Sequence, residues 1–83
     1  MNARVVAVNR NLGVVVVQTD THNCVVLDVD ATQTFVIGED VAGDWDQPGA
    51  IVVHNLTNGD KLSARVQKVN ATRSEAVGGM SFV

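Results

Sequence analysis

Four consecutive valines at positions 14–17 restrict the fold of this chain more than any other feature. β-Branched side chains lose rotamer freedom in a helix and pack well on a pleated surface, so the run predicts a β-strand. Valine is frequent elsewhere too, at 18 of the 83 residues, and no segment shows a helical apolar period over three turns. The sequence therefore predicts an all-β protein with little or no helix.

Turn residues divide the chain into short strands at intervals of roughly 8 to 12 residues, a spacing typical of a small barrel. The Asn58-Gly59 pair is the strongest hairpin signal, and Asn11 and Gly13 predict an earlier turn. We expect regular strands at 3–9, 14–20, 24–30, 50–55 and 61–69, and a less regular one within 34–45. These strands predict one domain, 1–69, folded as an OB-like barrel of five or six strands. Residues 70–83 are predicted to form a C-terminal tail that is flexible or an edge strand.

Length and composition limit the class of protein. A chain of 83 residues, 46% of them hydrophobic, suits one small domain with a modest core. Residues 1–10 have no apolar segment of signal-peptide length, and no run reaches the ~18 apolar residues of a membrane helix. We therefore expect a cytoplasmic protein.

Metal and catalytic sites are not predicted. Cys24 is the only cysteine, and with His22 and His54 it does not supply the four ligands of a structural zinc site. Cys24 and a histidine could act as nucleophile and base, but the chain offers no orienting third group or oxyanion-hole loop. Neighbouring acids such as Glu39 and Asp40 are typical of solvated turns. We expect no cofactor and no enzymatic activity.

The charges are distributed unevenly along the chain. The net charge is −3, and the span from Asn11 to Asp60 has no Lys or Arg but holds eight of the nine acidic residues. An acidic balance weakens the electrostatic attraction that dominates non-specific nucleic-acid binding. If the first and last strands pair, however, four basic side chains could line one groove for single-stranded nucleic acid: Arg4, Arg10, Lys61 and Arg65.

Trp45, the only tryptophan, lies between two carboxylates just before a turn. Those carboxylates would repel phosphate, so we expect Trp45 to cover the mouth of the barrel or lie in an interface rather than stack on a base.

The four-valine run is apolar on both faces of its strand. One face could therefore lie under something outside the core, such as a second subunit, and the alternative is a strand with a few exposed valines. The predicted partner-binding residues are Trp45, Asp44, Asp46 and Val15.

The stretch "VVAVNRNLGVVVVQTD" resembles the opening hairpin of a cold-shock-type OB barrel, with Asn9, Arg10 and Gly13 at the family's Asn, basic and Gly positions. The stretches "FVIGEDVAGDW" and "NGDKLSARVQ" resemble its later strands. The segments "GEDVAG" and "NLTNGD" are also similar to small uncharacterised bacterial barrel proteins. The resemblance spans about residues 3–68 and implies an OB-like fold.

The chain departs from the cold-shock family where that family binds its ligand. Cold-shock domains stack bases on aromatic side chains, at roughly 1–3 kcal/mol per base. Here the first two predicted strands have no aromatic residue, and the whole chain has only Phe35, Trp45 and Phe82. We therefore predict a non-catalytic interaction module that forms a homodimer or binds a protein partner. The alternative is a weak single-stranded nucleic-acid-binding domain.

Overall fold

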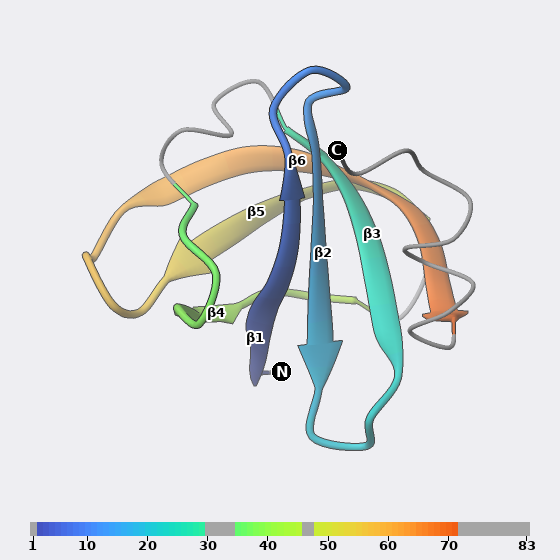
Figure 1. Cartoon of the computed structure of the whole chain (residues 1–83), viewed down its shortest axis with the longest axis horizontal. Helices are drawn as coiled ribbons and strands as arrows, with labels where there is room; N and C mark the ends of the chain where they lie inside the picture. Colours follow the sequence, from blue (N-terminus) through green and yellow to red (C-terminus); the bar gives the residue numbers. More distant parts are fainter. Residues whose placement is uncertain (1, 30–34, 46–47, 72–83) are drawn as a thin grey trace.

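The computed structural model is a closed barrel of six antiparallel strands (Figure 1). It describes residues 2–29, 35–45 and 48–71, with the backbone alone for residues 70 and 71. The strands are β1 (Asn2–Asn9), β2 (Val14–Thr19), β3 (Cys24–Val29), β4 (Asp40–Ala42), β5 (Gly49–Asn55) and β6 (Lys61–Ala71). Within the described ranges there is no helix, which confirms the all-β prediction.

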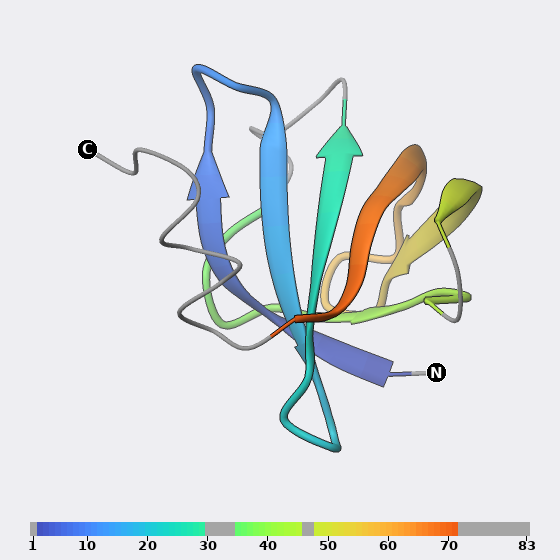
Figure 2. The same cartoon turned by 90° about the vertical axis from the view of Figure 1, so that its right-hand side faces the viewer.

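Two three-stranded meanders close the barrel. The first is β1-β2-β3 and the second is β4-β5-β6, and they meet where β3 pairs with β6 and β1 pairs with β4. The resulting order around the barrel is β1-β2-β3-β6-β5-β4. Figure 2 shows β3, β6 and β5 side by side along the wall. The arrangement is consistent with an OB-like barrel, and every strand of the ring has a partner on both sides.

The observed strands differ from the predicted ones mainly in the middle and at the end of the chain. The irregular strand predicted within 34–45 is only the three residues of β4, because a tight turn at 36–39 precedes it. The last strand continues past the predicted end at Val69 to Ala71. The rest of the predicted tail, residues 72–83, lies outside the described residues.

Two turns share the pattern Asn-x-x-x-Gly and the same hydrogen bonds. In the turn from β1 to β2, the Oδ1 atom of Asn9 accepts from the backbone N–H groups of Asn11 and Leu12, both at 3.1 Å. In the turn from β5 to β6, Asn55 accepts in the same way from the residues two and three positions later. The glycines that end the patterns, Gly13 and Gly59, have φ of 66° and 82°. A side-chain acceptor and a positive φ therefore define both hairpins.

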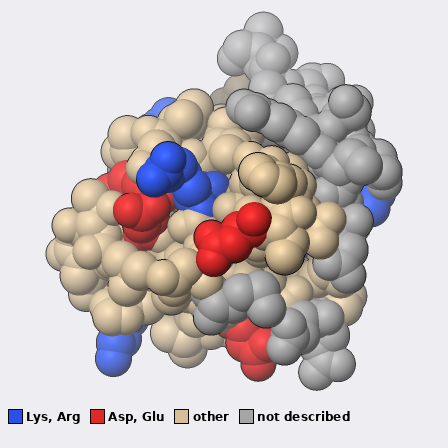
Figure 3. Space-filling view, turned by 90° about the horizontal axis from the view of Figure 1, so that it is seen from below, with Lys and Arg blue, Asp and Glu red and all other residues tan. Residues whose placement is uncertain are grey.

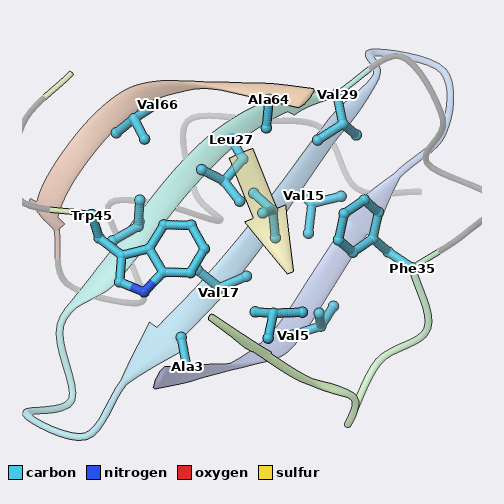
Figure 4. Packing of buried hydrophobic residues seen from close by; sticks show 13 residues of the cluster. Ala3, Val5, Val15, Val17, Leu27, Val29, Phe35, Trp45, Ala64 and Val66 are labelled. Atoms are coloured by element: carbon cyan, nitrogen blue, oxygen red, sulfur yellow. The ribbon is translucent and has the colours of Figure 1, made fainter. Parts of the chain in front are cut away.

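The barrel interior holds one cluster of apolar side chains, and Figure 4 shows Trp45 and Phe35 at opposite ends of it. Both aromatic rings are almost fully buried, at 2% and 0% exposure. A Cβ atom at Gly43 would lie 2.7 Å from Cη2 of the indole, so the ring packs where only a glycine fits. The buried members are Ala3, Val5, Val15, Val17, Val25, Leu27, Val29, Phe35, Val41, Trp45, Val53, Ala64 and Val66.

A second apolar cluster lies on the other side of the wall formed by β1, β2 and β3. Successive side chains of a strand point to opposite faces, so Val14 and Val16 face outward while Val15 and Val17 face the interior. The buried members of the outer cluster are Ala7, Val14, Val16, Cys24 and Val26, with Val6 packed against them. All four valines of the run are buried, so β2 is covered on both faces.

Candidate protein interface

The segment before β4 folds into a tight turn that is fixed to β1. The backbone N–H of Glu39 donates to the carbonyl of Val36 at 3.1 Å, and Gly38 has a φ of 97°, as a type II turn requires at its third position. Gly38 N–H donates to the carbonyl of Val5, and Val5 N–H donates to the carbonyl of Glu39, at 2.8 and 2.9 Å. The turn is therefore bonded to the sheet like a short strand.

Buried Asn55 joins this turn to the one that connects β5 and β6. Its Oδ1 atom accepts from the N–H groups of Thr57 and Asn58, and its Nδ2 atom donates to Oε1 of Glu39 at 3.3 Å. The same Glu39 oxygen accepts from the N–H of Val36 at 2.6 Å. One carboxylate and one amide side chain thus connect the two turns.

Backbone groups of Asp40 make two further connections between the turns. Its N–H donates to Oγ1 of Thr57 at 3.0 Å, and its carbonyl accepts from the N–H of Leu56 at 2.9 Å. A backbone held by this many hydrogen bonds loses little freedom when a partner binds. The two turns therefore form one rigid surface unit.

Exposed apolar side chains are concentrated on that unit. Of the five large apolar side chains exposed in the described part of the chain, Ile37, Val36 and Leu56 belong to the two turns, at 64%, 57% and 44% exposure. The other two, Leu12 and Val52, lie on the turn after β1 and on β5. Exposed apolar groups gathered within a polar surround mark protein interaction sites. We call Val36, Ile37 and Leu56 the two-turn patch.

A groove of about 700 Å³ lies beside the two-turn patch, and Leu56 belongs to both. Its polar lining includes Arg4, Asp20, His22 and Asp40. Nε of Arg4 lies 3.4 Å from Oδ1 of Asp40, with both side chains more than half exposed, so this ion pair adds little to stability. Figure 3 views the barrel from this end and shows basic side chains next to acidic ones.

Two of the four predicted partner-binding residues, Val15 and Trp45, are buried in the core. Val15 and Trp45 lie inside the barrel at 0% and 2% exposure, so neither can reach a partner while the barrel is folded. The outward valines of the same run are Val14 and Val16. Asp44 is exposed, as expected for a surface residue, and Asp46 lies outside the described residues.

Sequence reasoning did not select the two-turn patch. Val36 and Ile37 follow Phe35 in a short apolar run, within the irregular strand predicted over 34–45. The available signal was Gly38, since a glycine directly after two apolar residues can place them at the tip of a type II turn. Leu56 had a similar signal in its position between Asn55 and the Asn58-Gly59 pair.

The basic residues of the nucleic-acid alternative are separated by the strand order. β1 and β6 are not neighbours, because β2 and β3 lie between them on one side and β4 and β5 on the other. Arg4 pairs with Asp40, and Arg65 lies directly opposite Asp28 in the ladder between β3 and β6. Arg10 is in the turn beyond the far end of β1, and Lys61 begins β6 opposite His54. No groove between paired first and last strands brings these four cations together.

The remaining sequence candidates are also separated. His22 is in the turn between β2 and β3 with a φ of 66°, whereas Cys24 is buried at the start of β3. Among the described residues, no three His, Cys, Asp or Glu side chains are grouped as metal ligands. The same part of the chain contains no helix of the length and apolar character needed to cross a membrane.

Comparisons with known proteins identify no relative of this chain. No protein-family model matches the chain, and neither the curated proteins nor the solved structures give a significant match.

Proposed function

We propose that this protein is a non-catalytic interaction module with an OB-like barrel, and that it forms a homodimer through the two-turn patch. The supporting observation is that Val36, Ile37 and Leu56 provide three of the five exposed large apolar side chains described, on two turns joined by hydrogen bonds. Burial of such side chains is the main source of association energy. A rigid backbone beneath them reduces the entropy lost on binding.

A second copy of the chain suits this surface because its charges are of both signs. Glu39 ends the first turn and Asp40 begins β4 directly after it. Arg4 contacts Asp40, and Lys61 begins β6 directly after the second turn. A twofold interface places the same patch against itself, so a surface of one sign would repel its copy. A mixed surface allows acidic groups of one copy to face basic groups of the other. A domain this small also benefits from the additional apolar burial.

The test compares two valines with similar exposure. Val36 in the patch is 57% exposed and Val52 on β5 is 61% exposed. We expect the wild-type chain to show a dimer that dissociates on dilution in sedimentation velocity. Val36→Asp should be monomeric at concentrations where Val52→Asp still dimerises, because only the first places a charge in the interface. A wild-type chain that stays monomeric throughout, or equal weakening by both substitutions, would overturn the proposal.

Nucleic-acid binding is the competing outcome and is measured on the same samples. Fluorescence anisotropy of labelled single-stranded RNA and DNA at low salt should show no saturable binding at concentrations that give the dimer. Binding that saturates, fades steeply with salt and is lost in Arg65→Glu would replace the interaction-module proposal with the nucleic-acid alternative.

A further inference from the structure

The turn between β5 and β6 contains the one Asn-Gly pair of the sequence, Asn58-Gly59. The side-chain carboxamide of an asparagine can react with the backbone nitrogen of the next residue, because the attack closes an unstrained cyclic imide. A side chain on that next residue hinders the approach, and glycine has none. Residues 56–60 are all exposed, so water and hydroxide reach the pair. The pair is therefore a candidate site of chemical modification.

A hydrogen bond within the turn orients the carboxamide of Asn58. Its Oδ1 atom accepts from the backbone N–H of Asp60 at 2.9 Å. The ring that this bond closes contains Cγ, Cβ, Cα and the carbonyl carbon of Asn58 and the nitrogen of Gly59, which are the ring atoms of the imide. The same donor stabilises the negative charge that develops on Oδ1 when Cγ is attacked. The carboxamide is thus directed toward the attacking nitrogen, and its carbon is activated.

A second hydrogen bond restrains the attacking nitrogen. The N–H of Gly59 donates to the carbonyl of Asn55 at 2.8 Å. The nitrogen must lose this proton before it attacks, so the bond has to open first. Hydrogen bonds of exposed turns open locally far more often than those of a core. The folded turn therefore permits the reaction and limits its rate through the opening of one bond.

The other asparagines whose side chains are described do not share these features. Asn9 and Asn55 also accept hydrogen bonds at Oδ1, but they are buried at 7% and 0% exposure. Asn2, Asn11 and Asn23 precede residues that carry a side chain. In the described part of the chain, only Asn58 combines exposure, a following glycine and a bonded Oδ1.

We propose that Asn58 is a site of spontaneous deamidation, and that the reaction weakens association through the two-turn patch. The nitrogen of Gly59 gives its proton to solvent base and attacks Cγ of Asn58. A C–N bond forms, the bond between Cγ and Nδ2 breaks, and ammonia leaves with a proton from solvent. Water then opens the imide at either carbonyl, which gives aspartate or isoaspartate at position 58. The net reaction consumes one amide and one water and yields one carboxylic acid and one ammonia.

The effect on association rests on the proposed function. The new carboxylate lies two residues from Leu56 of the two-turn patch and two residues from Asp60, so it adds negative charge beside the patch. Isoaspartate also lengthens the backbone by one carbon between Asn55 and Asp60, whose N–H and carbonyl are bonded at 2.8 Å. The longer turn cannot keep all of its hydrogen bonds. Because Asn55 also donates to Glu39, the connection between the two turns is weakened as well.

Mass spectrometry tests the chemistry in any oligomeric state. Wild-type protein stored at mildly basic pH should gain the mass difference between OH and NH₂, and peptide mapping should place it at position 58. We expect conversion there to be at least about tenfold faster than at Asn11, which is also exposed. Absence of conversion at position 58, or a similar rate at Asn11, would overturn the proposal.

Gly59→Ala is the matched variant for the chemistry. A Cβ atom at Gly59 would meet no atom within 4 Å, so alanine fits the space, although its φ of 82° strains the backbone. The methyl group hinders the nitrogen and should slow conversion of Asn58 at least about tenfold. An unchanged rate in this variant would contradict attack by the backbone nitrogen.

Sedimentation velocity on fresh variants tests the effect on association. Asn58→Asp carries the charge of the product and should raise the dissociation constant of the dimer severalfold. Asn11→Asp places the same charge on the exposed turn after β1 and should leave the constant unchanged. Equal constants for the two variants would contradict the link between deamidation and association. A wild-type chain that is monomeric throughout contradicts the homodimer, whereas an unchanged mass at position 58 contradicts the deamidation, so the two failures are distinguishable.

Discussion

The two faces of β2 show that equal burial can serve different purposes. Val17 faces a core that contains Trp45, Phe35 and Leu27, whose large side chains fill the barrel. Val16 is equally buried but faces a cluster made only of valine, alanine and cysteine. Large interlocking side chains fix the shape of a closed interior, whereas small ones make a smooth surface that another layer can approach closely. The inner face therefore defines the barrel, whereas the outer face belongs to a second and smaller apolar cluster.

The largest effect is expected where the inner face loses its largest side chain. Trp45→Ala should lower the free energy of unfolding by about 3–5 kcal/mol, a large part of the 5–15 kcal/mol of an ordinary domain. Urea unfolding followed by far-UV circular dichroism measures the loss, and Trp45→Phe should retain much of the stability. A loss below about 1 kcal/mol would mean that the core does not depend on the indole.

The next effect tests how tightly the inner face is packed. Gly43→Ala places a methyl group 2.7 Å from Cη2 of Trp45, so the ring must move, at a cost of up to about 3 kcal/mol. Thermal unfolding measures the loss, and the same substitution in a Trp45→Phe background should cost less because the smaller ring leaves room. Equal losses in both backgrounds would contradict a direct contact between residue 43 and the indole.

The smallest effects compare valines on the two faces and at the surface. Val17→Ala should cost about 2 kcal/mol, Val16→Ala about 1 kcal/mol and Val52→Ala less than about 0.5 kcal/mol, because the three sites lose different amounts of packing. Urea unfolding of the three variants gives the ranking. A Val16→Ala loss no larger than that of Val52→Ala would show that the outer face is not packed in solution.

The sequence predicts those parts of the fold that depend on neighbouring residues. Turn signals such as Asn11 with Gly13 and Asn58 with Gly59 act over a few positions, so the strands around them are confirmed to within one or two residues. A strand was predicted within 34–45, but its restriction to the three residues of β4 was not, because that length follows from bonds between Val5 and the distant turn at 36–39. The pairing of β1 with β4 is equally non-local.

The candidate site was harder to predict for a related reason. A run of four valines has no alternation, so nothing local shows that Val15 faces inward and Val16 outward. The buried position of Trp45 depends on Gly43 and on the closed ring. The neighbours of Arg4 and Arg65 depend on the order of the strands. The sequence shows the type of each side chain. The face of the sheet on which a side chain lies, and its neighbours there, follow only from the fold.

The strand order also has a consequence for how the chain folds. Each meander forms from hairpins between adjacent segments, whereas the pairings of β1 with β4 and of β3 with β6 join distant ones. We expect docking of the two meanders to be the slow step, because distant contacts need more loop closure. An uncharged four-valine strand promotes aggregation when its edges are unpaired. As the central strand of the first meander, β2 gains partners on both edges before the ring closes, so the most aggregation-prone segment of the chain is protected early.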